Sequence, residues 1–264
     1  MATILKAVFL FMQQDIQITS TPLVDEKSFV DPAILEALVK AGVLYGSKKS
    51  KTHPRMQKYI FTTRNGIEII DVVQTLDLLA KAEEFLKTVV AKGGSIVFVG
   101  TTPAAKGSVE ALAKKFGYPY VTERWLGGTL TNFKTIHDRL QYYLKLKTDR
   151  ETGRLEKYTK KERFQFDKEI ERLTVLFGGL ENFTRLPDAL FVVGATSHDT
   201  ALRETKRSKI PVVALMSSDA DPDQVNYPIP GNDKARSSIV WVLNHIEKAL
   251  EEAKMNLKAK EPAK

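Results

Sequence analysis

Short apolar runs alternate with longer amphipathic stretches through most of the chain. The runs at 96–99, 119–121, 189–193 and 212–216 are predicted strands, and stretches with helical spacing separate most of them. Near-continuous apolar strands separated by helices are typical of a parallel sheet with helices on both faces. The pattern therefore predicts an α/β fold with a mostly parallel sheet, of the flavodoxin or Rossmann-like type.

Cap and turn residues mark the other expected elements. They predict helices over 31–42 and 71–93, and a last amphipathic helix that carries Ile239 to Leu250. The Arg64-Asn65-Gly66 sequence is a tight-turn signal, so it predicts a hairpin between strand-like residues 59–61 and a strand at 67–70. The run 227–231, which contains two prolines, precedes the last helix and is assigned to no strand.

Residues 131–176 interrupt this alternation. They contain two long helical patterns, whose apolar residues recur at alternating spacings of three and four, as in a coiled-coil seam. The charged stretch 147–157 contains Gly153, so we expect the helices to fold back as a protruding hairpin. The expected seam residues are Phe133, Ile136, Leu140, Tyr143, Phe166, Ile170, Leu173 and Leu176, and the cations expected at the far end are Lys145, Lys147, Arg150, Arg154, Lys157, Lys160 and Lys161.

This organisation divides the chain into four parts. We predict an N-terminal extension over 1–30, an α/β domain made of 31–130 and 177–253, the inserted hairpin over 131–176, and a basic flexible tail over 254–264.

Composition limits the classes of function. Of the 264 residues, 43% are hydrophobic, which is enough for one sizeable core. The chain has no cysteine, so disulfides, thiolate zinc sites and a cysteine nucleophile are excluded. The net charge of +8 favours a polyanionic partner. The apolar stretch 4–12 is too short to span a bilayer and lacks a signal-peptide pattern, so we expect a soluble protein with no membrane partner.

The stretch FVGTTPAAKGS, residues 98–108, has the outline of a phosphate-binding loop. A strand, a glycine and a helix start follow one another, and helix N-termini bind anions. A P-loop, however, requires Gly-Lys followed by a hydroxyl residue, whereas Lys106 here precedes Gly107. Thr102 and Ala105 also break the G-x-G-x-x-G pattern. We therefore predict an ordinary turn between a strand and a helix, with no nucleotide and no cofactor bound.

A stronger signal lies in residues 47–67, which we call the basic segment. It contains six cations and no acidic residue, and His53 and Tyr59 offer flat groups that could stack on bases. A solvated loop is the plainer interpretation. Because cations seated on phosphates release counterions, clustered charge of this kind favours nucleic-acid binding. The cations are Lys48, Lys49, Lys51, Arg55, Lys58 and Arg64.

The stretch RWLGGTLT, residues 124–131, which we call the glycine loop, allows two interpretations. In the structural one, Trp125 is a core residue, and Thr131 or the following Asn132 caps the next helix. In the functional one, the paired glycines allow close approach of the backbone to a phosphate, and the Arg124 guanidinium binds that phosphate. Composition does not separate the two.

Metal binding and catalysis are the remaining alternatives. His198, Asp219, Asp221 and Asp223 are ligand types that suit a divalent cation, but their spacing specifies no geometry, and helix caps and turns account for them.

Ser197-His198-Asp199 lacks a nucleophile elbow. A small-molecule or nucleotide-binding enzyme would carry an acid, a base or a cofactor fingerprint at the strand ends, and none is convincing here. We expect no enzyme. A protein-interaction module that uses only the hairpin fits the excess of Lys and Arg poorly.

Residues 124–136, RWLGGTLTNFKTI, resemble the signature of the bacterial-type ribosomal protein S2 family. Further similar stretches follow in order between about Ala37 and Leu250: AGVLYGSKKSKTHPRMQKYIFTTRNGIEIID, SIVFVGT, LPDALFVVGA, SKIPVVAL and SDADPDQVNYPIPGNDKA. The resemblance implies an α/β domain with a protruding helical hairpin. It also implies a non-catalytic component of the cytoplasmic small ribosomal subunit, placed between head and body. The implied partners are small-subunit ribosomal RNA and neighbouring ribosomal proteins.

Several positions depart from the family's pattern. The family often has histidines at the positions of Leu44 and Ser47, and it usually has a basic residue where Thr102 follows VGT, which weakens the case for an RNA contact there. The first 30 residues match no part of the pattern. The predicted RNA-binding residues are Lys48, Lys49, Lys51, His53, Arg55, Lys58, Arg64, Arg124, Gly127, Gly128 and Lys134.

Overall fold

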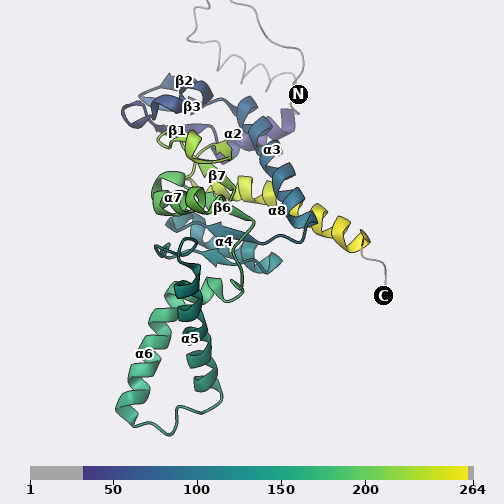
Figure 1. Cartoon of the computed structure of the whole chain (residues 1–264). Coiled ribbons are helices and arrows are strands. Elements are labelled where there is room, and N and C mark those ends of the chain that lie inside the picture. Colours follow the sequence, from purple (N-terminus) through teal and green to yellow (C-terminus); the bar gives the residue numbers. More distant parts are fainter. Residues whose placement is uncertain (1–31, 261–264) are drawn as a thin grey trace, which may run out of the picture. The chain divides into compact units, whose positions relative to one another are not determined.

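A five-stranded parallel sheet forms the centre of the fold in the computed structural model, which describes residues 32–260 (Figure 1). The strand order is β5-β4-β6-β7-β8. The predicted α/β fold with a parallel sheet is confirmed. The strands are β4 (Ile96–Val99), β5 (Tyr120–Val121), β6 (Ala189–Val193), β7 (Val212–Met216) and β8 (Tyr227–Pro230).

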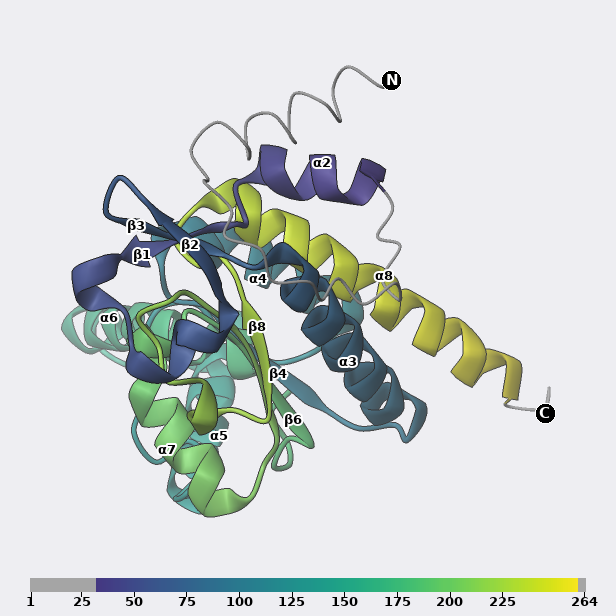
Figure 2. The same ribbon diagram turned by 90° about the horizontal axis from the view of Figure 1, so that it is seen from above.

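Helices cover both faces of this sheet, as the continuous apolar strands require. The helices α3 (Val72–Ala91), α4 (Pro103–Phe116) and α8 (Arg236–Lys260) pack with Phe98 and Phe191 on one face. On the other face, Val97 and Val99 pack with α7 (Asp199–Ser208) and with residues that precede β4 or follow β5. Figure 2 shows α3 and α8 side by side, with α7 across the sheet from them. Alternate residues of β4, β6 and β7 therefore serve two separate cores.

A second, antiparallel sheet of three strands follows the first helix, α2 (Pro32–Ala41). Its order is β1-β3-β2, with β1 (Tyr45–Lys48), β2 (Ile60–Arg64) and β3 (Ile67–Ile70). Asn65 and Gly66 have positive φ values of 49° and 74°, which a two-residue hairpin turn requires, so the predicted hairpin is confirmed. The sequence did not indicate β1, because YGSK has neither the alternation nor the apolar content of a strand.

The edge strand β8 was also missed, for a different reason. Pro228 and Pro230 argue against a strand because proline donates no ladder hydrogen bond. Nevertheless β8 pairs in parallel with β7, and the Gly231 N–H donates to the Met216 carbonyl at 2.9 Å. Proline is tolerated here because an edge strand has a neighbour on one side only.

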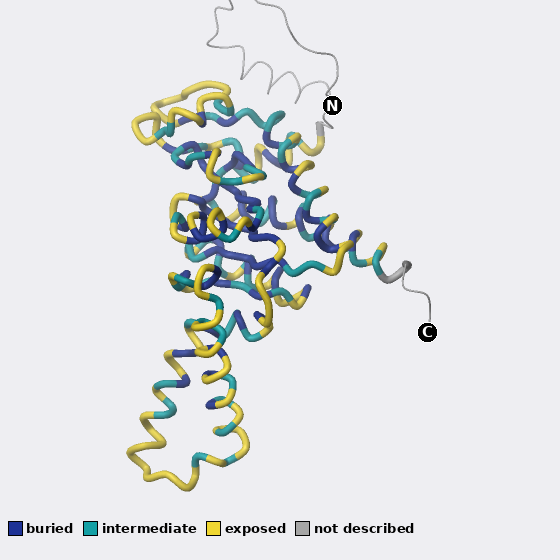
Figure 3. Tube along the Cα trace, viewed as in Figure 1, coloured by how far each residue is buried: buried dark blue, intermediate teal, exposed yellow. Residues whose placement is uncertain are grey.

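The segment predicted to be a hairpin contains α5 (Phe133–Glu151) and α6 (Lys160–Phe177). The two helices contact each other, with Arg150 Nε 3.0 Å from Asp167 Oδ1. Thr159 and Glu162 form a reciprocal capping box that begins α6. Leu140, Tyr143, Leu173 and Phe177 join the core beneath the sheet, whereas Figure 3 shows both helices becoming exposed toward their connection. Of the predicted seam, Leu140, Tyr143, Ile170 and Leu173 are buried, whereas Phe133, Ile136, Phe166 and Leu176 are half-buried.

Parts of the predicted domain organisation fall beyond these residues. The extension over 1–30, including the apolar stretch 4–12, lies outside the described residues, as do 261–264. The last helix continues to Lys260, past Lys254 where the tail was predicted to begin. Within 32–260, no helix is both long enough and apolar enough to cross a bilayer.

Candidate nucleic-acid interface

The basic segment runs from β1 through two short 3-10 helices into β2 and β3. These are η1 (Lys49–Lys51) and η2 (Pro54–Tyr59). Met56 is fully buried in the core beneath the sheet, and the His53 N–H donates to the Ser218 carbonyl at 2.8 Å. These two contacts fix the segment against the loop that follows β7, while the cations remain exposed.

Three of the predicted cations differ from the others in their surroundings. Within the described part of the chain, no carboxylate lies within ion-pair distance of Lys48, Lys49 or Lys51. All three are exposed, and η1 presents two of them within one turn. The Lys58 ammonium lies 4.9 Å from the centre of the Tyr59 ring, a cation–π contact with a neighbouring residue. The positive charges of Lys48, Lys49 and Lys51 are therefore not neutralised by ion pairs within the described chain.

Arg55, in contrast, has acidic partners that its own segment lacks. Its Nη1 lies 3.2 Å from Asp221 Oδ2 and 3.0 Å from Asp223 Oδ2. Residues 47–67 themselves contain no acidic residue. The expectation that the six cations have no counter-charge is nevertheless wrong for Arg55, because two aspartates from a distant part of the chain pair with it. The Asp221 carboxylate also accepts from the Asp223 N–H and so caps η5 (Pro222–Gln224).

His53 has a local role as well. Its Nδ1 accepts a hydrogen bond of 3.4 Å from the Arg55 N–H, which caps the start of η2. The ring is half-buried. This cap orients the imidazole, so any stacking would use the part of the ring that stays exposed.

The outer face of the three-stranded sheet carries a row of side chains that the sequence did not indicate. Lys48 and Arg64 both lie opposite Ile67, and Tyr45 lies opposite Ile69, so these residues share one face. The exposed fractions are 49% for Tyr45 and 40% for Ile67, which are high for such large apolar groups. Tyr45 was missed because β1 was not predicted. The signal that could have identified Tyr45 is its position only three residues before a cation of the basic segment, Lys48. The β-bulge between the two residues brings them onto the same face of the sheet.

The glycine loop turns its polar groups inward. The buried Glu204 carboxylate, on α7, accepts from the Trp125 indole N–H at 3.2 Å and from the Gly128 N–H at 2.8 Å. It also accepts from the Leu130 N–H at 2.9 Å and from both donors of Thr131, at 3.3 and 3.4 Å. Trp125 is 8% exposed and packs in the core. Trp125 is therefore a core residue, as the structural interpretation expects, and the Gly128 N–H already has an acceptor within the protein.

Some predicted residues of this region remain on the surface. Arg124, Gly127 and Lys134 are exposed. Asn132 precedes α5, but its side chain makes no cap to the backbone and instead accepts from the Thr135 hydroxyl at 2.9 Å. The loop follows β5 at one edge of the sheet, whereas the basic segment contacts the loop after β7. The two predicted RNA-binding stretches thus lie toward different edges.

The stretch that resembled a phosphate-binding loop has a packing explanation. A Cβ atom on Gly100 would lie 2.8 Å from Val109 Cγ2, so glycine is needed where β4 meets α4. The Lys106 ammonium pairs with the Glu123 carboxylate at 2.6 Å. These contacts favour the ordinary turn that we predicted.

His198 and the three acidic residues do not come together. His198 is buried, with Nδ1 2.7 Å from the Gly194 carbonyl oxygen and Nε2 3.1 Å from Thr101 Oγ1, and burial lowers its pKa. Asp219 pairs with Lys234, and the other two aspartates pair with Arg55. Among the residues that the structure describes, no three His, Asp or Glu side chains are grouped as metal ligands would be. His198 links the turns after β4 and β6.

Comparison with known proteins adds a separate line of evidence. The family model described as "Ribosomal protein S2" matches residues 38–253. A relative from Mycobacterium tuberculosis (strain ATCC 25618 / H37Rv), "Small ribosomal subunit protein uS2", is 43% identical over 218 residues, which cover 83% of this chain and 76% of the relative. Proteins with the same name from Nocardia farcinica and Dehalococcoides mccartyi are 41% and 40% identical. The second of these matches over 86% of this chain and 93% of its own length.

Proposed function

Because this chain belongs to the ribosomal protein S2 family, whose members are structural and not enzymatic, we propose that it is a component of the small ribosomal subunit between head and body. In this role it binds small-subunit ribosomal RNA and neighbouring ribosomal proteins, in the cytoplasm, without nucleotide or cofactor. The matched range includes the basic segment, the glycine loop and both helices α5 and α6.

One observation carries the RNA-binding part of this proposal. Lys48, Lys49 and Lys51 are exposed and have no carboxylate within ion-pair distance in the described chain, while Met56 anchors their segment in the core. A fixed backbone that presents uncompensated cations is suited to bind phosphates in a defined register. The remaining predicted RNA-binding residues, namely His53, Arg55, Lys58, Arg64, Arg124, Gly127, Gly128 and Lys134, stay part of the proposal.

Tyr45 extends this surface. Its ring lies on the same sheet face as Lys48, and it is about half exposed. Aromatic rings next to cations bind single-stranded or splayed nucleotides by stacking while the cations hold the backbone. We assign Tyr45 to a base or ribose contact beside the phosphate contacts.

The helices α5 and α6 suit a different partner. Several of their distal cations are already paired within this region, such as Arg150 with Asp167 and Arg154 with Asp149. Carboxylates are interspersed among the cations of these two helices, whereas the basic segment contains none of its own. We therefore propose that α5 and α6 form a docking arm that contacts neighbouring ribosomal proteins.

Reconstitution tests the proposed function. Small subunits from which this protein has been removed by a salt wash should take up the purified protein and sediment with it. The variant in which residues 148–159 are replaced by a short Gly-containing turn should be taken up less, while its melting temperature stays within about 5 °C, because the buried contacts of Tyr143 and Phe177 are retained.

Two results would contradict the proposal. Failure of the wild-type chain to sediment with small subunits would reject the ribosomal role. Normal uptake of the shortened variant would reject the docking arm but leave the RNA-binding surface in place.

A further inference from the structure

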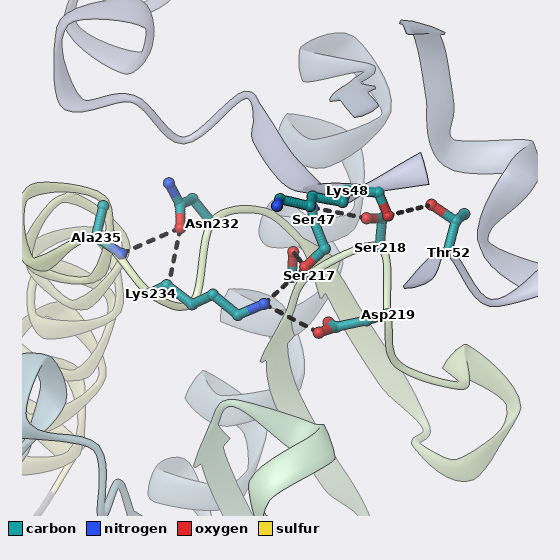
Figure 4. A network of polar contacts seen from close by, with 9 residues as sticks. All are labelled: Ser47, Lys48, Thr52, Ser217, Ser218, Asp219, Asn232, Lys234 and Ala235. Carbon is teal, nitrogen blue, oxygen red and sulfur yellow. Dashed lines mark hydrogen bonds and ion pairs between the residues drawn. The ribbon is translucent and has the colours of Figure 1, made fainter. Parts of the chain in front are cut away.

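A group of polar side chains joins β1 to the loops that follow β7 and β8 (Figure 4). The Ser47 N–H donates to Ser218 Oγ at 2.8 Å, and Ser47 Oγ lies 3.1 Å from Ser217 Oγ. Ser47, Ser217 and Ser218 are all buried. The backbone also approaches closely here, since a Cβ on Gly46 would lie 2.9 Å from Ser218 Oγ. The start of the basic segment is therefore fitted against the end of β7.

The Lys234 ammonium completes this junction. It donates to Ser47 Oγ at 2.7 Å and to Asp219 Oδ2 at 3.0 Å, so it contacts both the basic segment and the loop after β7. Because Ser47 Oγ accepts from the lysine, its own hydrogen is available for Ser217 Oγ. Figure 4 shows the lysine side chain extending from its loop to lie between these groups.

We propose that Lys234 is a positioning residue: its ammonium ties Ser47 to Asp219, and it thereby sets the placement of the basic segment for RNA without contacting RNA itself. This inference rests on the proposed function, because it concerns how the same surface is held. It adds Lys234, Ser47 and Asp219 to the residues on which RNA affinity depends.

The loop that carries Lys234 is itself fixed on both sides. Asn232 Oδ1 accepts from the backbone N–H groups of Lys234 and Ala235, at 3.0 and 3.1 Å. The Asn232 side-chain amide donates to the Gly42 carbonyl, and its backbone N–H donates to the Val43 carbonyl. The lysine therefore extends from a loop that is already hydrogen-bonded to the residues just before β1, which limits the positions its ammonium can reach.

The local charges also favour a cation at this point. Asp219 Oδ1 and Asp233 Oδ1 are buried oxygens without a hydrogen-bond partner in the described structure. Burial and the neighbouring Asp219 carboxylate raise the pKa of Asp233 to about 6, and the Lys234 charge opposes this rise. Removing the ammonium would leave two close carboxylates without their cation.

The expected effect is local rather than global. The Lys234 side chain is 62% exposed, and ion pairs at exposed positions contribute little to the stability of the whole fold. The Ser47 hydroxyl, by contrast, has two partners among the described residues, Ser217 Oγ and the Lys234 ammonium, so the loss of Lys234 removes one of them. We therefore expect a displaced or more mobile basic segment on an otherwise stable domain.

Lys234→Met tests this, since methionine keeps much of the stem but removes the ammonium, and Lys234→Arg is the charge-retaining control. We expect the Kd for small-subunit ribosomal RNA to rise about fivefold in the methionine variant, and to return to within about twofold of wild type in the arginine variant. Amide hydrogen exchange of the free protein should become faster at Ser47 and His53, whose N–H groups donate to Ser218. Ser47→Ala removes both the acceptor of the Lys234 ammonium and the contact with Ser217 Oγ, so it should change RNA affinity and exchange in the same direction.

Several outcomes would overturn the inference. Unchanged exchange at Ser47 and His53 in Lys234→Met would show that the ammonium does not hold the segment. Weaker binding with a lower salt slope and unchanged exchange would show that Lys234 binds a phosphate directly. If Lys234→Met fails to fold, the lysine is a general stability residue. Hydrogen exchange is measured in the free protein, without RNA. Failure of the wild-type protein to bind ribosomal RNA would therefore reject the proposed function, but not the role of Lys234 in placing the basic segment.

Discussion

In the basic segment, cations point outward from a backbone that Met56 holds in the core. In the glycine loop, the backbone donors and an indole point inward to the carboxylate of Glu204. Both stretches belong to the family pattern, and both were predicted to bind RNA. Their difference shows that one signature stretch can present its charged groups to solvent, while another uses its polar groups within the fold. The direction of its hydrogen bonds separates the two cases.

Glu204→Ala should have the largest effect, and it should be on stability. The carboxylate is 6% exposed and accepts from five donors in the glycine loop, so its loss leaves several buried N–H groups unpaired. We expect the free energy of unfolding to fall by about 3 kcal/mol in denaturant titrations, since each buried unpaired group costs about 1–3 kcal/mol. Glu204→Gln, which keeps one acceptor oxygen, should lose less. A variant as stable as wild type would mean that the loop is not held by this carboxylate.

Reversing Lys48, Lys49 and Lys51 to Glu should have the next largest effect, and it should be on RNA binding. We expect the affinity for ribosomal RNA to fall about 30-fold or more at 0.1 M salt. The slope of log K against log salt should flatten by about 2, because each lost phosphate contact removes about 0.7–0.9. Stability should change little, since these side chains are exposed.

A matched control carries the same change in net charge elsewhere. Lys81, Lys92 and Lys206 are exposed and lie on or beside α3 and α7. Reversing these three to Glu should leave the salt slope close to that of wild type. Equal loss of affinity in both triple variants would mean that net charge, and not the basic segment, governs binding.

The two glycines of the loop offer a smaller and sharper comparison. Gly128 has φ of +92°, and a Cβ there would lie 3.3 Å from Asn132 Cβ, so Gly128→Ala should lower the free energy of unfolding by about 1 kcal/mol. Gly127 is exposed, and nothing lies within 4 Å of its ideal Cβ, so Gly127→Ala should leave thermal stability unchanged. A fall in RNA affinity for Gly127→Ala alone would place a phosphate against this part of the loop. An unchanged affinity would remove Gly127 from the RNA-binding set.

Replacing Asp221 and Asp223 with Asn should have the smallest effect. Both carboxylates pair with Arg55, and the substitution releases this guanidinium while removing two negative charges near the basic segment. We expect RNA affinity to rise about twofold at low salt, with the gain vanishing at high salt, as for other screened surface charges. Weaker binding would show instead that the acidic pair orients Arg55 for RNA.

Local signals in the sequence were sufficient for most of the fold. The strands β4, β6 and β7 are continuous apolar runs, and Asp71 caps α3 as its position predicted, accepting from the N–H groups of Val73 and Gln74. The two missed strands lack such signals. β1 is short and polar, and β8 contains two prolines, so only their neighbours in the sheet define them as strands.

The candidate site was less predictable because its decisive contacts join distant residues. Arg55 meets Asp221 across 166 positions, and Gly128 meets Glu204 across 76. A count of charges within the basic segment could not show which cation is neutralised from elsewhere in the chain. In the same way, the composition of the glycine loop could not show that its amides already have an acceptor.

The prolines of β8 have a consequence for the protein before it reaches a partner. Ile229 is in register with Leu215, and the Gly231 N–H donates to β7, so the alternation of the strand turns the nitrogens of Pro228 and Pro230 to the outer side. These positions offer no N–H group to which an incoming strand could bond. Exposed strand edges are the usual starting points of aggregation, and proline at the edge is one way in which proteins suppress it. The side of β8 that faces away from β7 is thus protected against pairing with other chains while the protein is unassembled.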